Sequence, residues 1–153
     1  MKQHEHIVLA DDDADERQFF LDALLEAQPD MTLATVDNGE RLMKHLRELD
    51  TSPDCIFLDL NMPRKNGKEC LLELRKNPKT EKIPIIIYST SLNWRDIDET
   101  YRLGATCFVR KPDNFGELKD ILTDNLPFLF SRPDHPRVRD NFVINPGKAY
   151  EKY

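Results

Sequence analysis

Short runs of aliphatic and β-branched residues alternate with amphipathic stretches through the first 126 residues of this chain. Five of these runs have the length of a strand, at residues 6–10, 31–36, 54–58, 83–88 and 106–110. Each is followed by a stretch whose apolar residues recur at helical spacing. Strands that are apolar on both faces and alternate with helices form a parallel sheet covered on both sides. The pattern therefore predicts an α/β fold with a doubly wound, five-stranded parallel sheet.

Local signals indicate where several of the helices begin and end. Asp13 and Glu16 have the spacing of a capping box, which opens a helix in this pattern. Gly104 is placed to end the fourth helix, because glycine readily adopts the left-handed conformation that follows many helices. Pro127 is placed to end the fifth helix, which we expect over residues 114–126.

Composition excludes several classes of protein. No apolar run approaches the roughly 18 residues of a membrane span, and the apolar run after the N-terminus is too short for a signal peptide, which predicts a cytoplasmic protein. The net charge of −6 argues against direct nucleic-acid binding. The three cysteines, Cys55, Cys70 and Cys107, lack the paired spacing of a zinc site or a disulfide framework, so we expect reduced, buried thiols.

Residues 127–153 differ in composition from residues 1–126. The first 126 residues carry 17 basic and 25 acidic side chains, whereas the last 27 carry 5 basic and 3 acidic ones and five of the chain's thirteen aromatic residues. We interpret residues 1–126 as one domain and residues 127–153 as a C-terminal extension, too short for a separate output domain of ordinary size. Phe128 and Phe130 should be buried, and Arg132, Arg137 and Arg139 could lie along an acidic surface. The extension either shapes a homodimer or partner surface or covers an apolar patch of its own chain.

Polar residues follow four of the predicted strands, at the edge where doubly wound sheets bind their ligands. They are Asp11, Asp12 and Asp13 after the first strand, Asp59 after the third, Ser89 and Thr90 after the fourth, and Lys111 after the fifth. Clustered carboxylates repel one another, and a set of oxygen ligands without histidine or cysteine favours Mg²⁺ as the compensating cation. Asp59 could then attack a phosphoryl group, with Lys111 and the metal neutralising its oxygens. Taken singly, such acids often only cap helices, and Lys111 could be a surface charge.

Four segments together resemble the receiver domain of two-component response regulators, in its stand-alone, chemotaxis-regulator-like form. They are IVLADDD, CIFLDLNMPRKNG, PIIIYSTS and GATCFVRKP, and the resemblance covers about residues 5–126. It implies a flavodoxin-like fold with strand order 2-1-3-4-5. It also implies a cytoplasmic phosphoprotein that takes a phosphoryl group from a sensor histidine kinase or a histidine phosphotransfer protein. Such a protein promotes only its own phosphorylation and dephosphorylation, and it signals by switching a surface that binds a downstream protein.

The resemblance assigns a role to each residue of the predicted site. Asp59 matches the phosphoacceptor, Asp12 a direct Mg²⁺ ligand, and Asp11 a ligand that acts through water. The main-chain carbonyl of Asn61 would supply a further metal ligand. Lys111 matches the phosphate-binding lysine, whose bond to Pro112 would be cis.

Two further residues match the family's conformational switch. Ser89 corresponds to the switch hydroxyl, although the neighbouring Thr90 could compete for that role, and Phe108 corresponds to the switch aromatic residue. Phe108 could also be an ordinary core residue. Trp94 follows in the same segment as Ser89, where we expect it to pack against the domain and to report on movement.

Two other functions share features of this sequence. A flavodoxin-like carrier of flavin mononucleotide needs a phosphate loop after the first strand, where three consecutive aspartates would repel phosphate. A phosphatase of the haloacid-dehalogenase type would use Asp11 and Asp13 as nucleophile and acid. The chain has Asp15 where that family has threonine or valine, and it lacks that family's later acidic pair. The receiver interpretation is therefore favoured.

Overall fold

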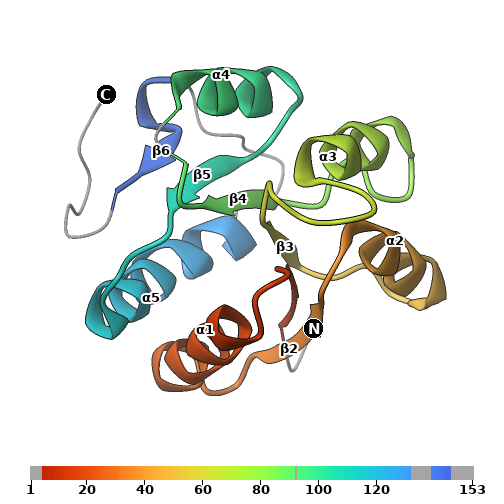
Figure 1. The fold of residues 1–153 in the computed structure, drawn as a ribbon. Helices are drawn as coiled ribbons and strands as arrows, with labels where there is room; N and C mark the ends of the chain where they lie inside the picture. The colour runs from red at the N-terminus through yellow and green to blue at the C-terminus, as the bar shows by residue number, and fades with distance from the viewer. Residues whose placement is uncertain (1–4, 92, 132–138, 146–153) are drawn as a thin grey trace.

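The computed structural model describes residues 5–91, 93–131 and 139–145 as a sheet of parallel strands with helices on both faces (Figure 1). The strands are β1 (His6–Ala10), β2 (Thr32–Val36), β3 (Cys55–Leu58), β4 (Ile85–Ser89), β5 (Cys107–Arg110) and β6 (Val143–Ile144). The helices are α1 (Ala14–Ala27), α2 (Gly39–Glu48), α3 (Gly67–Lys76), α4 (Trp94–Arg102) and α5 (Phe115–Ser131), and a 3₁₀ turn spans Arg139–Asn141. The strand order is β2-β1-β3-β4-β5-β6, so the predicted order of the first five strands is confirmed.

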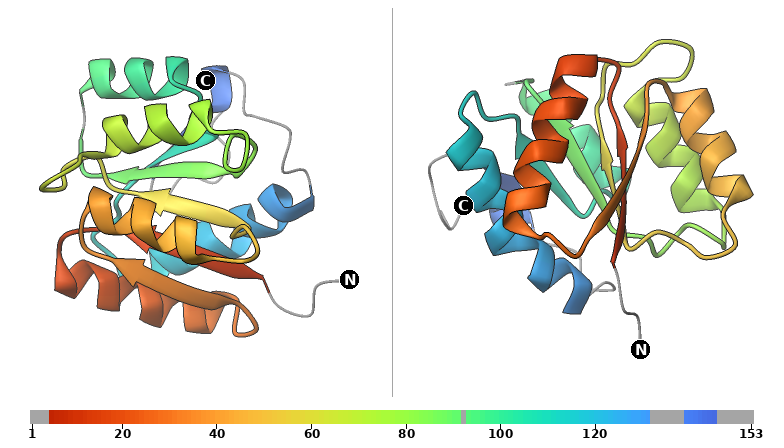
Figure 2. Two further views of the ribbon diagram at one scale, coloured as in Figure 1. Left: turned by 90° about the vertical axis from the view of Figure 1, so that its right-hand side faces the viewer. Right: turned by 90° about the horizontal axis from the view of Figure 1, so that it is seen from below.

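The two faces of the sheet bury two separate clusters of side chains. Successive residues of β1 alternate between them: Ile7 and Leu9 pack with α1 and α5, whereas Val8 and Ala10 pack on the opposite face. Figure 2 shows α1 and α5 on one side of the sheet and α2 and α3 on the other. Because both faces are covered, the central strands are apolar throughout, and the polar residues lie at the strand ends.

Side-chain caps open the first four helices. Asn66 and Glu69 form a reciprocal capping box at α3, and Asn38 and Asn93 cap α2 and α4. Asp13 caps α1 by accepting hydrogen bonds from the backbone N–H groups of the second and third helical residues. The capping box predicted there is wrong in one half, because the Glu16 carboxylate turns to Lys111 instead. At the end of α4, Gly104 has a φ of +98°, which confirms its predicted role.

Helix α5 does not end at Pro127 as predicted but continues to Ser131. The hydrogen bond lost at the proline is offset by burial, because Leu122, Leu126 and Leu129 lie at helical spacing in the cluster shared with α1. This continuation also corrects the expectation for the two phenylalanines. Phe128 is 38% exposed, and Phe130 is only partly buried.

A sixth strand extends the predicted five-stranded sheet. The segment that contains β6 lies along the free edge of β5, and Phe108 and Val109 pair with Val143 and Ile144. Phe142, just before β6, is fully buried, with its ring 5.2 Å from that of Tyr101 in α4 and 6.5 Å from that of Phe108. The extension therefore contributes a core residue.

Other sequence predictions have mixed outcomes. All three cysteines are buried and free. The guanidinium of Arg139 lies 6.0 Å from the ring of Tyr101, while Arg132 and Arg137 fall outside the described residues. The cis bond predicted before Pro112 is wrong, because the described peptide bonds are all trans, which is the preference of most X-Pro bonds. No helix in the described ranges is long and apolar enough to cross a membrane.

Candidate functional site

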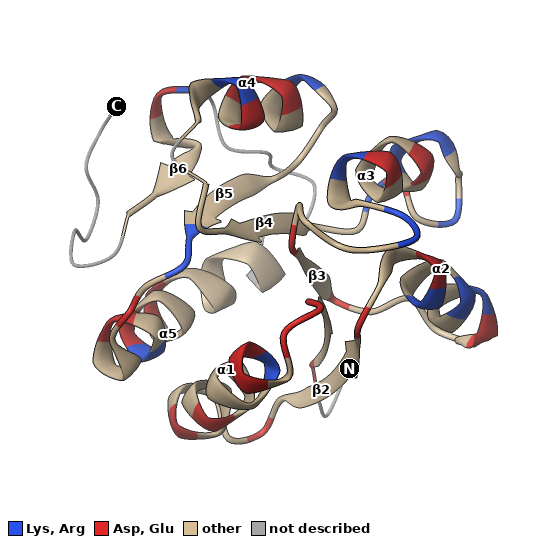
Figure 3. Ribbon diagram, in the orientation of Figure 1, with Lys and Arg blue, Asp and Glu red and all other residues tan. Residues whose placement is uncertain are grey.

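The predicted polar residues meet at the edge formed by the carboxyl ends of the strands. Asp11 directly follows β1, Asp59 follows β3, Ser89 ends β4 and Lys111 follows β5. Backbone hydrogen bonds between neighbouring strands fix these positions: the N–H of Asp59 donates to Ala10, and the N–H of Lys111 donates to Ser89. Figure 3 shows acidic residues after β1 and β3 facing the basic end of β5.

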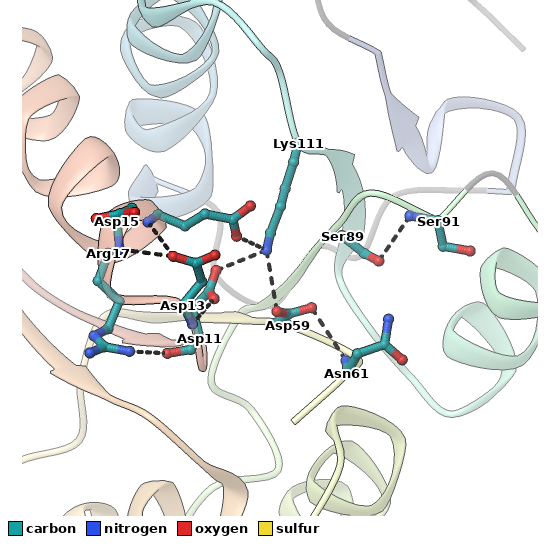
Figure 4. A network of polar contacts seen from close by, with 10 residues as sticks. Asp11, Asp13, Asp15, Arg17, Asp59, Asn61, Ser89, Ser91 and Lys111 are labelled. Carbon is teal, nitrogen blue, oxygen red and sulfur yellow. Dashed lines mark hydrogen bonds and ion pairs between the residues drawn. The ribbon is translucent and has the colours of Figure 1, made fainter. Parts of the chain in front are cut away.

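Lys111 is the centre of the site. Its Nζ atom lies 2.9 Å from Oδ2 of Asp11 and 3.2 Å from Oδ2 of Asp59, and it also contacts the Glu16 carboxylate (Figure 4). The ring of Tyr88 lies 5.3 Å from the same nitrogen. Three carboxylates share one ammonium group, so the side chains around Lys111 carry an excess of two negative charges.

The loop between β3 and α3 places Asp59. The backbone N–H of Asn61 donates to Oδ1 of Asp59 at 3.3 Å, and the loop returns to the strand end through a bond from Gly67 N–H to Leu60. A Cβ atom on Gly67 would lie only 2.3 Å from the carbonyl oxygen of Asp59, so this close approach requires glycine. Asp59 is nearly buried, with 5% of its surface exposed.

Burial and charge shift the pKa values of these groups. Burial raises the pKa of Asp59, and the nearby Asp11 adds to this effect, while Lys111 opposes it. Burial likewise raises the pKa of Glu16. Burial would lower the pKa of Lys111, but the contacts with Glu16, Asp11 and Asp59 outweigh it and raise that pKa. The arrangement keeps the lysine charged and makes the Asp59 and Glu16 carboxylates harder to ionise.

The carboxylates form a group suited to a hard cation. Ligand oxygens of Asp11, Glu16 and Asp59 all lie within 4.8 Å of one another. Asp11 is fully buried, and its Oδ2 atom makes no hydrogen bond, since the contact to Lys111 lacks hydrogen-bond geometry. A buried carboxylate oxygen without a hydrogen bond, among further acidic oxygens, fits a divalent cation such as Mg²⁺. Asp12 is exposed and does not belong to this group.

The two candidate hydroxyl groups after β4 differ in their surroundings. Ser89 is buried, and its Oγ atom accepts a hydrogen bond of 3.1 Å from the backbone N–H of Ser91, whereas Thr90 is exposed. Ser91 in turn donates to Asp96 in α4 at 2.5 Å. Ser89 therefore stands at the start of a polar connection from the site to α4. Figure 4 shows the first of these bonds, between Ser89 and Ser91.

The predicted switch aromatic residue Phe108 lies within β5, and the predicted reporter Trp94 lies at the start of α4. Phe108 is completely buried, and its ring lies 6.5 Å from that of Phe142, so in this structure the ring is part of the core. Trp94 is 66% exposed at the start of α4, and the expectation that it packs against the domain is wrong. Its ring instead has the guanidinium of Arg95 at 5.9 Å, a contact that leaves the indole accessible to solvent.

The sequence prediction missed Glu16 as a member of the site. Glu16 lies three residues after the N-cap aspartate, which is the spacing of a capping box. We therefore assigned its carboxylate to the helix cap and did not predict its contact with Lys111. The signal that could have identified it is the helix register. The third residue of a helix that starts at the strand-end edge can face back toward that edge.

This fold, with two acidic strand ends, a buried serine that ends β4 and a strand-end lysine, defines a receiver domain. The chain belongs to the response regulator receiver domain family, whose model matches residues 7–123. It is 32% identical over 120 residues to response regulator Rcp1 of Synechocystis, covering 75% of this chain and 80% of that protein. It also matches a longer protein-glutamate methylesterase of Geobacter metallireducens, of whose length it spans 35%.

Solved structures give the same assignment. The phosphorylated cyanobacterial phytochrome response regulator RcpA superimposes with a TM-score of 0.77 at 32% identity, covering 84% of this chain and 95% of that one. The Mn²⁺-bound form of Rcp1 superimposes with a TM-score of 0.72 at 28% identity, covering 78% and 93%. The phosphatase alternative gains no support, since the Asp13 carboxylate that it requires is used to cap α1.

Proposed function

We propose that Asp59 accepts a phosphoryl group from the phosphohistidine of a sensor histidine kinase or histidine phosphotransfer protein, or from a small phosphodonor. The observation that carries this proposal is the placement of a nearly buried carboxylate 3.2 Å from Lys111 and within 4.8 Å of other acidic oxygens. The protein is then a signalling phosphoacceptor that promotes only its own phosphorylation and dephosphorylation.

In the proposed transfer, an oxygen of the Asp59 carboxylate attacks phosphorus in line with the leaving group. The new O–P bond makes an acyl phosphate, while the P–N bond of phosphohistidine breaks and its electron pair stays on the imidazole nitrogen. Lys111 neutralises charge on the phosphoryl oxygens from the β5 side. The backbone N–H of Asn61 holds the other oxygen of Asp59, so the nucleophile is oriented before the donor arrives.

Mg²⁺ is the proposed cofactor. Asp12, Asp59 and the main-chain carbonyl of Asn61 would hold it directly, with Asp11 acting through a water molecule. The Oδ2 atom of Asp11, which is ion-paired with Lys111 but makes no hydrogen bond, and the negative charge of the group support a divalent cation here. When bound, the ion would supply charge neutralisation for the phosphoryl oxygens. Asp12 would need to turn inward from its exposed position.

The proposed response is a shift in the surface formed by α4, β5 and α5. Ser89 would exchange its hydrogen bond with Ser91 for one to a phosphoryl oxygen, which moves the segment between β4 and α4 inward. Phe108 would follow that movement. Strand β6 pairs with β5, and Phe142 packs near Phe108 of β5. The segment that contains them would therefore form part of the surface that a downstream protein contacts.

Several features of the protein remain predictions. We expect output by protein contact without nucleic-acid binding, a cytoplasmic location, and residues 127–153 acting as an extension rather than an output domain.

A homodimer shaped by this extension is tested by light scattering of the full chain and of a chain ending at Ser131, each with and without beryllofluoride. Identical monomers in every condition would exclude the homodimer.

Intact-mass measurement after incubation with acetyl phosphate and Mg²⁺ tests the phosphoacceptor proposal. The wild-type protein should gain one phosphoryl group, Asp59→Asn should gain none, and Asp12→Ala should gain little because metal binding fails. A matched Asp22→Asn variant, which changes an exposed acid on α1 away from the site, should behave as wild type. Uptake by Asp59→Asn at the wild-type rate would refute the assignment.

A further inference from the structure

We propose that Glu16 is a positioning residue of the phosphoacceptor site, which holds Lys111 before phosphorylation and competes with the phosphoryl group for it. This inference rests on the proposed function, because it assigns a role within the same site. We therefore expect Glu16 to lower the affinity of the site for a phosphoryl group.

The start of α1 directs Glu16 toward the site. Glu16 is the third residue of the helix, and its backbone N–H donates to the capping carboxylate of Asp13 at 3.2 Å. Its side chain does not return to the cap but crosses to Lys111, which directly follows β5. A contact between residues 95 positions apart joins α1 to the end of β5 across the acidic site.

The contacts of Lys111 leave little room for an additional partner. An ammonium group has three N–H donors, and Nζ of Lys111 is in ionic contact with three carboxylates, while the ring of Tyr88 lies against it. A phosphoryl oxygen on Asp59 would compete with these carboxylates for the same ammonium group. Asp59 itself becomes the acyl phosphate, so the competing carboxylates are those of Asp11 and Glu16.

Burial indicates which of these two partners yields. The side chain of Asp11 is fully buried, whereas that of Glu16 is 37% exposed and can swing into water. Releasing Glu16 costs less because water then solvates its carboxylate, whereas a released Asp11 would stay buried and uncompensated. Glu16 is therefore the partner that Lys111 exchanges for the phosphoryl group.

The charge of Glu16 acts in the same direction. Its carboxylate lies within 4.8 Å of that of Asp59, where a phosphoryl group would add further negative charge. With the dielectric constant of water, which gives the smallest repulsion, two unit charges at this distance repel by an energy equivalent to about a fourfold change in affinity. Removing the charge of Glu16 should therefore strengthen the binding of a phosphoryl mimic at least about fourfold.

The test is a beryllofluoride titration at saturating Mg²⁺, followed by the fluorine NMR signal of the bound group. We expect Glu16→Gln to lower the half-saturating concentration at least about fourfold. Asp15→Asn is the matched control: it removes the same charge from the neighbouring exposed position, and it should change the value less than twofold. The nitrogen NMR signal of Lys111 Nζ provides a second measurement, which should shift in Glu16→Gln before beryllofluoride is added and stay in place in Asp15→Asn.

The outcomes separate this inference from the proposed function. Tighter binding by Glu16→Gln alone, together with the shifted Lys111 signal, supports the positioning role. Equal or weaker binding by Glu16→Gln, with normal binding by wild type, overturns this inference and leaves the phosphoacceptor proposal intact. If wild type binds no beryllofluoride and takes up no phosphoryl group from acetyl phosphate, both are overturned.

Discussion

The charge of Asp59 is expected to destabilise the metal-free protein. Its carboxylate lies within 4.8 Å of those of Asp11 and Glu16, and Coulomb's law with an effective dielectric constant of about 20 gives at least about 3.5 kcal/mol of repulsion for each pair. Lys111, at 3.2 Å, returns about 5 kcal/mol of attraction on the same scale. The balance leaves the ionised Asp59 unfavourable by about 2 kcal/mol. Removing this charge should therefore stabilise the fold.

Urea or thermal unfolding of wild type and Asp59→Asn in buffer with EDTA measures this effect. The variant should be more stable by about 2 kcal/mol, which for a domain of this size raises Tm by about 4–8 °C. Saturating Mg²⁺ should reduce or reverse the difference, because the cation compensates the carboxylates of the wild type more than those of the variant. A variant that is less stable than wild type in EDTA, or a difference that Mg²⁺ leaves unchanged, would refute the reasoning.

The pH dependence of the same difference gives a second check in metal-free buffer. Burial raises the pKa of Asp59, so the folded state binds its proton more tightly than the unfolded state does. The stability of wild type should therefore fall as pH rises from the unfolded value of about 3.9 through the folded value. Asp59→Asn lacks this loss, so its advantage should be absent below about pH 4 and full at neutral pH.

The other predictions concern the lysine, the tryptophan and the C-terminal strand. Lys111→Ala should destabilise the metal-free fold by about 3 kcal/mol, because buried carboxylates lose their counter-ion, and it should slow or uncouple the phosphorylation response measured with acetyl phosphate. Emission from Trp94 should change when Mg²⁺ and beryllofluoride are added together and not with either alone; a silent signal despite demonstrated binding would mean that this segment stays in place. Phe142→Ala should cost about 3 kcal/mol in urea unfolding, whereas Phe128→Ala, at an exposed ring, should cost less than about 1 kcal/mol. Equal costs would contradict the core position of Phe142.

The central sheet and the position of the site follow from the sequence because both depend on short-range patterns. Apolar runs identify the buried strands, and the polar residues that end them must share one edge in a parallel sheet. Asp11, Asp59 and Lys111 meet there for that reason. Asp12 is exposed whereas its neighbour Asp11 is buried, which illustrates that adjacent residues of one loop can face opposite directions.

The features that the sequence analysis missed depend on contacts between distant segments. Helix α5 continues beyond Pro127 because Leu129 is buried in a cluster with side chains from other elements, and the sequence pattern near Pro127 does not reveal those contacts. Strand β6 has only two residues, too few for a recognisable period, and its formation depends on the free edge of β5 and the space that Phe142 fills. Glu16 satisfied a local capping pattern, so only the position of Lys111 in space reveals its other partner.

Chemical identification of the phosphorylated residue tests whether Asp59 is the phosphoacceptor. Borohydride reduces an aspartyl phosphate to homoserine, so peptide mapping after acetyl phosphate, Mg²⁺ and borohydride locates the modified side chain. We expect homoserine at position 59, and none when Mg²⁺ is replaced by EDTA. Homoserine at Asp11, Asp12 or Asp13, or an unmodified position 59 in protein whose mass has gained a phosphoryl group, would show that another residue accepts the phosphoryl group.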